Sequence, residues 1–505
     1  MSQGEVLVFE NGVVRTLDPE SPRLADWVLV EGGRVRRVGS GEPYARSEAR
    51  RIDLGGRALI PAFTDAHVHL TWIATSFMGP DLSWTEDPEE VALGVGRWEE
   101  KGRGPGGEWI VGSGFDESTW TEKRLPTRRE LDAAVKNRPV LVKRVCGHVG
   151  VVNSQALKDL PPGAHTDRES GRIAETDLWA LNDRLRPGPA ELAEILPRVV
   201  DRLHSHGITA VHDVTSAEMF RALQIGRARW TLPVRVSCSL PADKLASLRA
   251  CGMQSGLGDA TLRILGIKVF VDGSLGARTA FLREPYTDDA ATRGAALYTP
   301  DVLAALVEDA DAAGLQLMIH AIGDAGLERV LDVVGTRFAN GNPLRHRLEH
   351  VEVTPPDLVH RLVASGLYAC VQPNFVGRWS QPGGMNEQRL GARLAHCNAY
   401  RTLLRAGVPL SFGSDCMPLG PMEGLRAAVQ HPDPAQGLSP LEAVGLYTAA
   451  SAFVVGAEKR HGRIRPGMSA DFAVLSEDPA TPEGIANARV EATYFEGRRV
   501  YSREG

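Results

Sequence analysis

The sequence predicts an α/β fold: a (β/α)8 TIM barrel with a composite N- and C-terminal β-sandwich and a large insertion after the first barrel strand. Short strand patterns occur at both ends of the chain, and apolar strand candidates alternate with helix candidates between them. The first two barrel strands are too far apart for one helix and its loops. The eight candidates are 59–64, 208–211, 234–239, 265–271, 315–319, 347–351, 367–371 and 409–412.

The two ends of the chain are predicted to fold together. Asn11-Gly12 between two apolar runs is a strong hairpin signal, and Gly32-Gly33 separates a second pair of runs in the same way. Residues 470–501 repeat this style near the C-terminus. Neither end is long enough to build a core alone. We therefore expect residues 1–57 and 462–505 to form one small β-sandwich.

Residues 58–70 and 208–461 are expected to form the barrel. Helices are predicted at 301–313 and 355–365, each followed by a glycine, which is a good C-cap residue. Residues 71–207 must carry their own structure, and we expect an inserted domain that covers the barrel mouth. Its elements are predicted as a strand at 139–145 and helices near 127–136 and 189–206.

Composition excludes several classes of partner. A net charge of −6 and a pI near 6.2 give no reason to expect nucleic acid or an anionic membrane. No apolar run is long enough to span a bilayer, and the first residues lack the pattern of a signal peptide. The six cysteines are scattered, without a C-x-x-C pair. We expect a cytoplasmic protein with a small-molecule substrate, and a homodimer is one option for its assembly.

His67 and His69 are the first candidates for chemistry. Residues i and i+2 of a strand point to the same side, so both imidazoles can converge at the carboxyl end of the first barrel strand. Two converging imidazoles are half of a zinc-type site, although a structural role for such a pair alone is equally open. Other candidates follow later strands at their carboxyl ends, where TIM barrels place function. They are Lys268, His320, His350 and Asp415.

Each of these residues also has a structural interpretation. A lone histidine at a strand end is more often hydrogen-bonded core than ligand, Lys268 could extend its amine out of the apolar strand, and Asp415 could cap a turn. Four imidazoles, one carboxylate and one lysine, all at predicted strand ends, are hard to explain as coincidence. The set favours a metal site.

With these residues the chain resembles the amidohydrolase superfamily, whose pattern is His-x-His on strand one, Lys on strand four, His on strands five and six, and Asp on strand eight. The closer likeness is to amidohydrolase family 3, the N-substituted formamide deformylase-like branch. That likeness depends on Lys268–Ala280, on Gly114-Phe115-Asp116 with Trp120, on Pro126-Thr127-Arg128 with Leu131-Asp132, and on Gly147-His148 with Asn153-Ser154.

The resemblance implies a metal-dependent hydrolase of carbon–nitrogen bonds. His67, His69 and Asp415 would hold one metal, and His320 and His350 a second, with zinc the expected ion and one or two per chain. Lys268 would bridge them as a carbamate made with CO₂. Divalent metals activate water and polarise carbonyls, and Asp415 would be the catalytic base that passes a proton to the leaving nitrogen.

Two alternatives stay open. The same site could hydrolyse esters or lactones or carry out a decarboxylation, because it activates water whatever the leaving group. The chain could also be a catalytically silent scaffold, although such a scaffold needs neither a buried lysine nor Asp415. The expected substrate is a small organic amide, formamide or cyclic amide. Six residues are candidates for substrate contact, with structural roles equally open: Trp84, His148, Asn153, His212, Arg278 and Gln372.

Overall fold

The computed structural model of the protein describes residues 5–20, 24–43, 49–100 and 108–504. It divides into two compact units. The barrel unit comprises residues 1–69, 197–216 and 231–505, and the second unit comprises residues 70–196 and 217–230.

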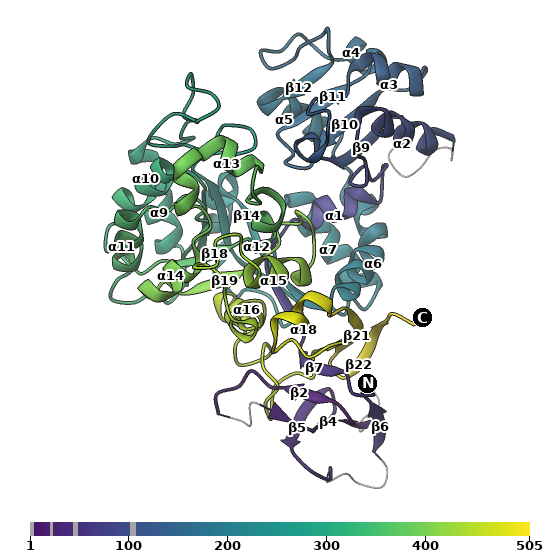
Figure 1. Cartoon of the computed structure of the whole chain (residues 1–505), viewed down its shortest axis with the longest axis vertical. Helices are drawn as coiled ribbons and strands as arrows, with labels where there is room; N and C mark the ends of the chain where they lie inside the picture. The colour runs from purple at the N-terminus through teal and green to yellow at the C-terminus, as the bar shows by residue number, and fades with distance from the viewer. Residues whose placement is uncertain (1–4, 21–23, 44–48, 101–107, 505) are drawn as a thin grey trace. The chain divides into compact units, whose positions relative to one another are not determined.

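Eight parallel strands form the central sheet of the barrel unit (Figure 1). Each strand pairs in parallel with the next one along the chain. The strands are β8 (Phe63–Val68), β13 (Ile208–Val214), β14 (Arg235–Pro241), β15 (Leu262–Phe270), β16 (Gln316–Ala321), β17 (Arg347–His350), β18 (Tyr368–Val371) and β19 (Leu410–Phe412). The predicted α/β barrel class is confirmed.

The first and last strands of the barrel approach each other where Gly413 follows β19. A Cβ atom at Gly413 would lie 2.5 Å from the His67 backbone nitrogen, so only glycine fits here. The contact continues, because Ser414 N donates to Asp65 Oδ1 at 2.8 Å and Asp415 N donates to His67 O at 2.8 Å. This near-closure of the barrel brings Asp415 beside His67.

The first predicted strand, 59–64, is wrong in its boundaries. The apolar run is shared by β7 (Ala58–Pro61), which belongs to another sheet, and by β8 of the barrel. The chain changes partners between them, since Ala62 N donates to Asp471 O and Phe63 N donates to Gly207 O. A continuous apolar run does not reveal such a change, because both strands are buried.

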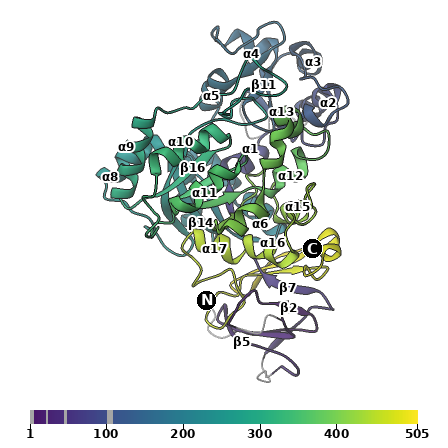
Figure 2. The same cartoon turned by 60° about the vertical axis from the view of Figure 1, so that its left-hand side comes forward.

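Helices follow the barrel strands, and Figures 1 and 2 both show α9, α10 and α11 together on one side of the sheet. The predicted helices at 301–313 and 355–365 are confirmed as α9 and α11, and Gly366 caps α11 at φ 73°. The helices are α8 (Leu245–Ala250), α9 (Pro300–Ala312), α10 (Asp324–Val334), α11 (Pro356–Ser365), α12 (Pro373–Trp379), α13 (Met385–Leu390), α14 (Tyr400–Ala406), α15 (Pro421–Val429), α16 (Pro440–Leu446), α17 (Ala449–Val454) and α18 (Pro482–Asn487), with 3-10 turns at Ala242–Lys244 and Gly391–His396.

Two further sheets of the barrel unit combine both ends of the chain. One has the order β5-β4-β1-β6 and the other β22-β21-β20-β7-β2-β3. Phe9, Phe472 and Tyr494 meet edge to face in their shared core, so N- and C-terminal segments bury each other. The strands are β1 (Val6–Glu10), β2 (Val13–Arg15), β3 (Leu24–Ala25), β4 (Trp27–Glu31), β5 (Arg34–Gly39), β6 (Arg50–Asp53), β7, β20 (Phe472–Leu475), β21 (Val490–Phe495) and β22 (Arg498–Ser502).

One of the two predicted hairpins near the N-terminus is wrong. Gly32-Gly33 does join the antiparallel strands β4 and β5, but β1 and β2 lie in different sheets. Asn11 donates to Asp53 Oδ1 at 2.7 Å, and Val13 N donates to Arg57 O at 3.0 Å. These contacts carry the chain from one sheet into the other, and they outweigh the local turn signal.

The second unit contains its own four-stranded sheet, of order β12-β11-β10-β9. The predicted strand at 139–145 and helix near 127–136 are confirmed as β10 and α3, and a capping box at Thr127 and Glu130 starts α3. The elements are α1 (Leu70–Ser76), α2 (Pro88–Glu100), β9 (Ile110–Phe115), α3 (Arg128–Ala134), β10 (Val140–Arg144), β11 (Val149–Val152), α4 (Ser154–Lys158), β12 (Arg172–Ala174), α5 (Glu175–Arg184) and α7 (Ala217–Arg229), with a 3-10 turn at Glu117–Thr119. Helix α6 (Pro189–Ser205) runs from this unit into the barrel unit.

The three-part domain division and the role of residues 71–207 as a cover of the barrel mouth stay predictions. Within the described ranges, no helix combines the length and the apolar character needed to cross a bilayer.

Candidate metal centre

His67, His69 and Asp415 form a close group of potential metal ligands. His67 lies in β8, His69 follows it, and Asp415 follows β19. Asp415 Oδ1 lies 3.0 Å from His69 Nε2 and 3.6 Å from His67 Nε2. One ligand atom from each of the three residues lies within 4.8 Å of the others. These distances and residue types suit a cation such as Zn²⁺.

Lys268, His320 and His350 extend this group along the carboxyl ends of β15, β16 and β17. Lys268 Nζ lies 3.4 Å from His67 Nε2. The imidazole centroids form a row, in which His67 and His350 are 5.0 Å apart and His350 and His320 are 4.4 Å apart. The structure thus brings together all six residues that the sequence predicted as ligands.

Hydrogen bonds fix the tautomers of three of these imidazoles. Nδ1 of His67 donates to Glu349 Oε2 at 2.5 Å, and Nδ1 of His350 donates to Gln372 Oε1 at 2.8 Å. In each ring Nε2 then carries the lone pair. His320 is turned the other way, because its Nε2 donates to Gly273 O at 3.0 Å and leaves the lone pair on Nδ1. Such partners orient metal-binding histidines and raise their basicity.

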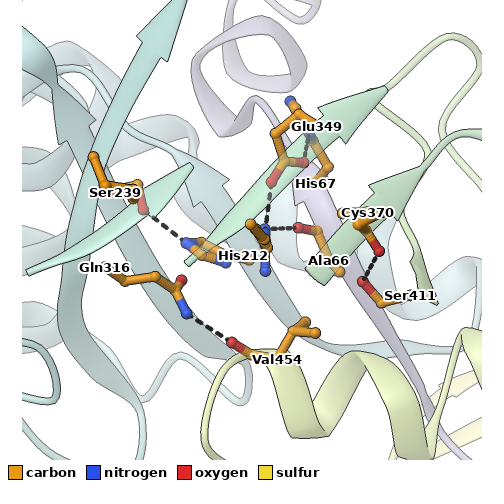
Figure 3. A network of polar contacts seen from close by, with 12 residues as sticks. Ala66, His67, His212, Ser239, Gln316, Glu349, Cys370, Ser411 and Val454 are labelled. Atoms are coloured by element: carbon orange, nitrogen blue, oxygen red, sulfur yellow. Dashed lines mark hydrogen bonds and ion pairs between the residues drawn. The ribbon is translucent and has the colours of Figure 1, made fainter. Parts of the chain in front are cut away.

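A buried ion pair, which was not among the residues predicted from the sequence, supports His67. Arg347 Nε donates to Glu349 Oε1 at 2.6 Å, and Arg347 Nη2 donates to Ala66 O at 2.7 Å. Arg347 and Glu349 are both fully buried. Figure 3 shows Glu349 beside His67 in this network. Charged residues at alternate positions of a predicted interior strand, Arg347 and Glu349, were the signal that could have revealed it.

The backbone at the site adopts conformations that strands do not allow. His350 and Asp415 have φ values of 74° and 52°, in the left-handed region that costs a non-glycine residue about 1–3 kcal/mol. In a regular strand the side chains of Glu349 and His350 would point to opposite faces of the sheet. The positive φ of His350 breaks this alternation. Asp65 holds the backbone on the other side, since its Oδ1 accepts from His67 N at 3.2 Å and from Ser414 N.

The ionisation of the site favours cation binding. Burial, followed by the charge of Lys268, lowers the pKa of His67 well below its ordinary value, and burial followed by His320 does the same for His350. Both rings are therefore neutral, as metal ligands must be. Burial would raise the pKa of Asp415, but the contact with the His69 ring and the positive charge of Lys268 help to hold the pKa below its ordinary value, which favours the anion.

Two features of the residues present fit a metal. Asp415 Oδ1 is buried and faces the His69 and His67 imidazoles at 3.0 Å and 3.6 Å, without a well-aligned hydrogen bond to either. Lys268 is almost fully buried, burial lowers its pKa to about 8, and no carboxylate among the described residues forms an ion pair with it. An unsatisfied carboxylate oxygen and an unpaired buried amine are costly unless a further group completes them.

A second group, His67, Glu349 and Cys370, also has ligand atoms within 4.8 Å of one another. It fits a metal less well. Both Glu349 oxygens already accept hydrogen bonds, from His67 and from Arg347. Burial raises the pKa of Cys370 well above its ordinary value, which disfavours the thiolate that zinc binds. We assign this group to the support of His67.

Three candidates for substrate contact belong to the barrel unit. Gln372 accepts from His350, so it positions a ligand. His212 is fully buried and bonds through Nε2 to Ser239 Oγ at 2.8 Å, as Figure 3 shows. Arg278 pairs through both Nε and Nη2 with Asp288. Each side chain has a structural partner, and a contact of any of them with substrate stays a prediction.

The other three candidates belong to the second unit. The predicted substrate contact of Asn153 is corrected by its surroundings. The side chain is fully buried, its Oδ1 accepts from Val140 N and Ala156 N at 3.0 Å each, and it is the N-cap of α4. Its role is structural. His148 is half-buried and pairs with Glu175 at 3.2 Å, and Trp84 is 45% exposed. His148 and Trp84 stay predictions.

Comparisons with known proteins agree with this geometry. A family model described as "Amidohydrolase family" matches residues 50–501. The putative amidohydrolase YtcJ of Bacillus subtilis is 28% identical, over 98% of this chain and 99% of its own. The N-substituted formamide deformylase of Arthrobacter pascens is 28% identical over the full length of both chains. A crystal structure of an uncharacterized metal-dependent hydrolase from Pyrococcus horikoshii superimposes with a TM-score of 0.78 at 28% identity, covering 98% of this chain and all of that one.

Proposed function

Because the chain belongs to the amidohydrolase family, we propose that it is a metal-dependent hydrolase of a carbon–nitrogen bond in a small organic amide, formamide or cyclic amide. The observation that carries this proposal is the close group of His67, His69 and Asp415, with Lys268 beside it. A neutral His67 ring, a second imidazole, an anionic carboxylate and a buried amine without a carboxylate partner suit a hydrolytic metal centre.

The proposed ion is Zn²⁺, one or two per chain. His67, His69 and Asp415 would hold one ion, and His320 and His350 a second. Carboxylation of Lys268 by CO₂ would convert its amine into an anion with two oxygens, able to contact both ions. Bound there, a divalent cation supplies Lewis acidity, which polarises a carbonyl and lowers the pKa of water.

The protein's own residues supply orientation and proton transfer. Glu349 and Gln372 hold His67 and His350 in the tautomer that presents Nε2. Asp415 Oδ1 faces the same space as His67 and His69. As an anionic carboxylate at pH 7 it can accept a proton from the attacking water and return it to the leaving nitrogen.

An exposed aromatic ring beside the site suggests the kind of substituent the substrate carries. Phe270 is 41% exposed, its ring lies 4.8 Å from Lys268 Nζ, and it lies 5.2 Å from the His320 ring. A large apolar side chain exposed next to reactive groups is a natural contact for an apolar substituent. We propose N-substituted formamides as the first class to test, in keeping with the activity named for the Arthrobacter pascens relative.

The six unpaired cysteines suit a cytoplasmic protein, and a homodimer stays one option for its assembly. Hydrolysis of esters or lactones, or decarboxylation, is the second candidate, since the same groups would serve it. A silent scaffold is disfavoured by Lys268, which is costly to bury without a function.

A substrate screen tests the proposal. Metal-stripped protein and the same protein reconstituted with Zn²⁺ would be assayed against N-alkyl and N-aryl formamides, N-acyl amines, cyclic amides and the matching esters. We expect turnover only after reconstitution, with the formamides fastest. Turnover of esters alone would replace the proposed reaction, and equal turnover by metal-free protein would overturn it.

A further inference from the structure

A small cavity at the amino-terminal ends of β13 and β14 is rich in basic side chains. It lies away from the candidate metal centre, which is at the carboxyl ends of the strands. The space open to the centre of a water molecule is about 10 Å³, which is room for one water-sized particle. The lining residues with polar side chains are Arg235, Ser237, Arg263, Arg460 and His461, and no carboxylate among the described residues lines it.

Arg235 is buried and only partly satisfied. It is 5% exposed, and its Nη2 pairs with Asp471 at 3.1 Å and with Glu496 at 3.1 Å. Its Nε and Nη1 are buried and have no hydrogen-bond partner. An unsatisfied buried donor of a charged group costs about 1–3 kcal/mol or more. Two such donors on one side chain that lines a cavity point to an acceptor in that cavity.

The other basic groups add positive charge without a matching carboxylate. Arg263 donates to Ser237 Oγ at 3.1 Å and to the Val455 carbonyl, which are both neutral. Neither Arg263 nor Arg460 forms an ion pair in the part of the chain that the structure describes. Burial, then Arg460 and Arg345, lowers the pKa of Arg263 to about 10, and burial with Arg235 lowers that of His461 to about 3.

The acidic groups near the cavity are already engaged. Asp471 and Glu496 pair with Arg235, and Glu458 forms a bidentate pair with Arg345. Arg235, Arg263 and Arg460 carry three positive charges against the two carboxylates of Asp471 and Glu496, so one positive charge is left over, which a water molecule in the cavity would not neutralise. An anion would both neutralise this charge and accept from Arg235.

We propose that this cavity binds one monoatomic anion, chloride, against Arg235, Arg263 and Arg460. The size of the cavity excludes phosphate, sulfate and organic carboxylates. The bound ion would join β14 to the segment that carries Val455 and Arg460. It would also accept the hydrogen bonds that Arg235, the partner of Asp471, otherwise leaves unmade. Its role is structural, and it is independent of the hydrolytic site.

Thermal unfolding of the full-length, metal-loaded protein tests this inference. Tm would be measured against sodium chloride, with sodium gluconate added to keep ionic strength constant. A ligand that binds only the folded state raises Tm with its concentration. We expect Tm to rise with chloride or bromide and to be lowest in gluconate alone, because gluconate is too large for the cavity. Equal Tm values in chloride and gluconate would overturn the inference, and the cavity would then be assigned to a water molecule.

A variant and a crystal locate the ion. Arg460→Gln keeps the other contacts of the cavity and should raise the half-saturating chloride concentration about tenfold, the loss of one hydrogen bond to a charged group. Arg465→Gln removes an exposed arginine that pairs with Glu20 outside the cavity, and should behave like wild type. Crystals soaked in bromide should show an anomalous peak beside Arg235 Nε. An unchanged chloride response in Arg460→Gln, or bromide peaks only elsewhere, would contradict the assignment.

Discussion

Replacing Glu349 with glutamine should weaken metal binding through His67 without touching a ligand. Glu349 accepts from two buried donors, His67 Nδ1 and Arg347 Nε. A glutamine of the same shape has one acceptor oxygen and one NH₂ group. The charged Arg347 forms the stronger hydrogen bond and takes the oxygen, so the NH₂ group faces His67 Nδ1 and the ring must move its proton to Nε2. The lone pair that faces Asp415 and Lys268 is then lost.

The expected magnitude follows from this geometry. Changing a residue that orients a metal-binding histidine typically costs 10–100-fold in metal affinity, or about 1.4–2.8 kcal/mol. Arg347 would lose its charged partner in a fully buried position, and breaking such a pair costs about 3–5 kcal/mol of folding stability. Both effects should appear together in Glu349→Gln.

The assay is zinc affinity by chelator competition at pH 7, with urea unfolding of the metal-free protein beside it. Glu352→Gln is a matched control from the same segment. Glu352 is buried, and burial with the charge of Asp272 raises its pKa to about 8, so it is already neutral at pH 7. The control should keep wild-type zinc affinity. Wild-type affinity in Glu349→Gln would refute the claim that Glu349 orients His67.

Three further substitutions test the proposed roles of site residues. Asp415→Asn removes the proposed base and should lower kcat by at least about 10²–10⁴-fold; near wild-type turnover would remove Asp415 from the mechanism. Lys268→Ala should lose metal, measured by elemental analysis, and short carboxylic acids or high bicarbonate should restore part of it; full metal content without them would argue against a bridging carbamate. Phe270→Ala should raise KM for N-aryl formamides roughly tenfold, the apolar contact of one phenyl ring, and leave KM for formamide itself unchanged; equal effects on both would remove Phe270 from substrate binding.

The six proposed ligands could be predicted because a barrel gathers the carboxyl ends of its strands. Once Lys268, His320 and His350 are recognised as strand ends, topology alone brings them together, whatever their separation in sequence. The terminal sheets could be predicted in part, since strand patterns at both ends were plain. Which of these strands pair with one another was harder to predict from the sequence. The Asn11-Gly12 signal is local, and contacts with Asp53 and Arg57 overrule it.

The supporting residues could not be assigned from sequence in the same way. Glu349 acts on a histidine 282 positions away, and Gln372 on one 22 positions away, so their roles depend on contacts that no local pattern encodes. Asn153 is the opposite case. An asparagine just before a short helix is an N-cap signal, and this local role is the one that the buried Asn153 side chain has.

A crystal structure of active protein, with anomalous data collected above and below the zinc edge, would reveal the proposed metal centre itself. We expect a peak bound by His67, His69 and Asp415, a second beside His320 and His350 if the centre is binuclear, and electron density beyond Lys268 Nζ. Crystals of fully active protein with no metal at His67, His69 and Asp415 would contradict this expectation.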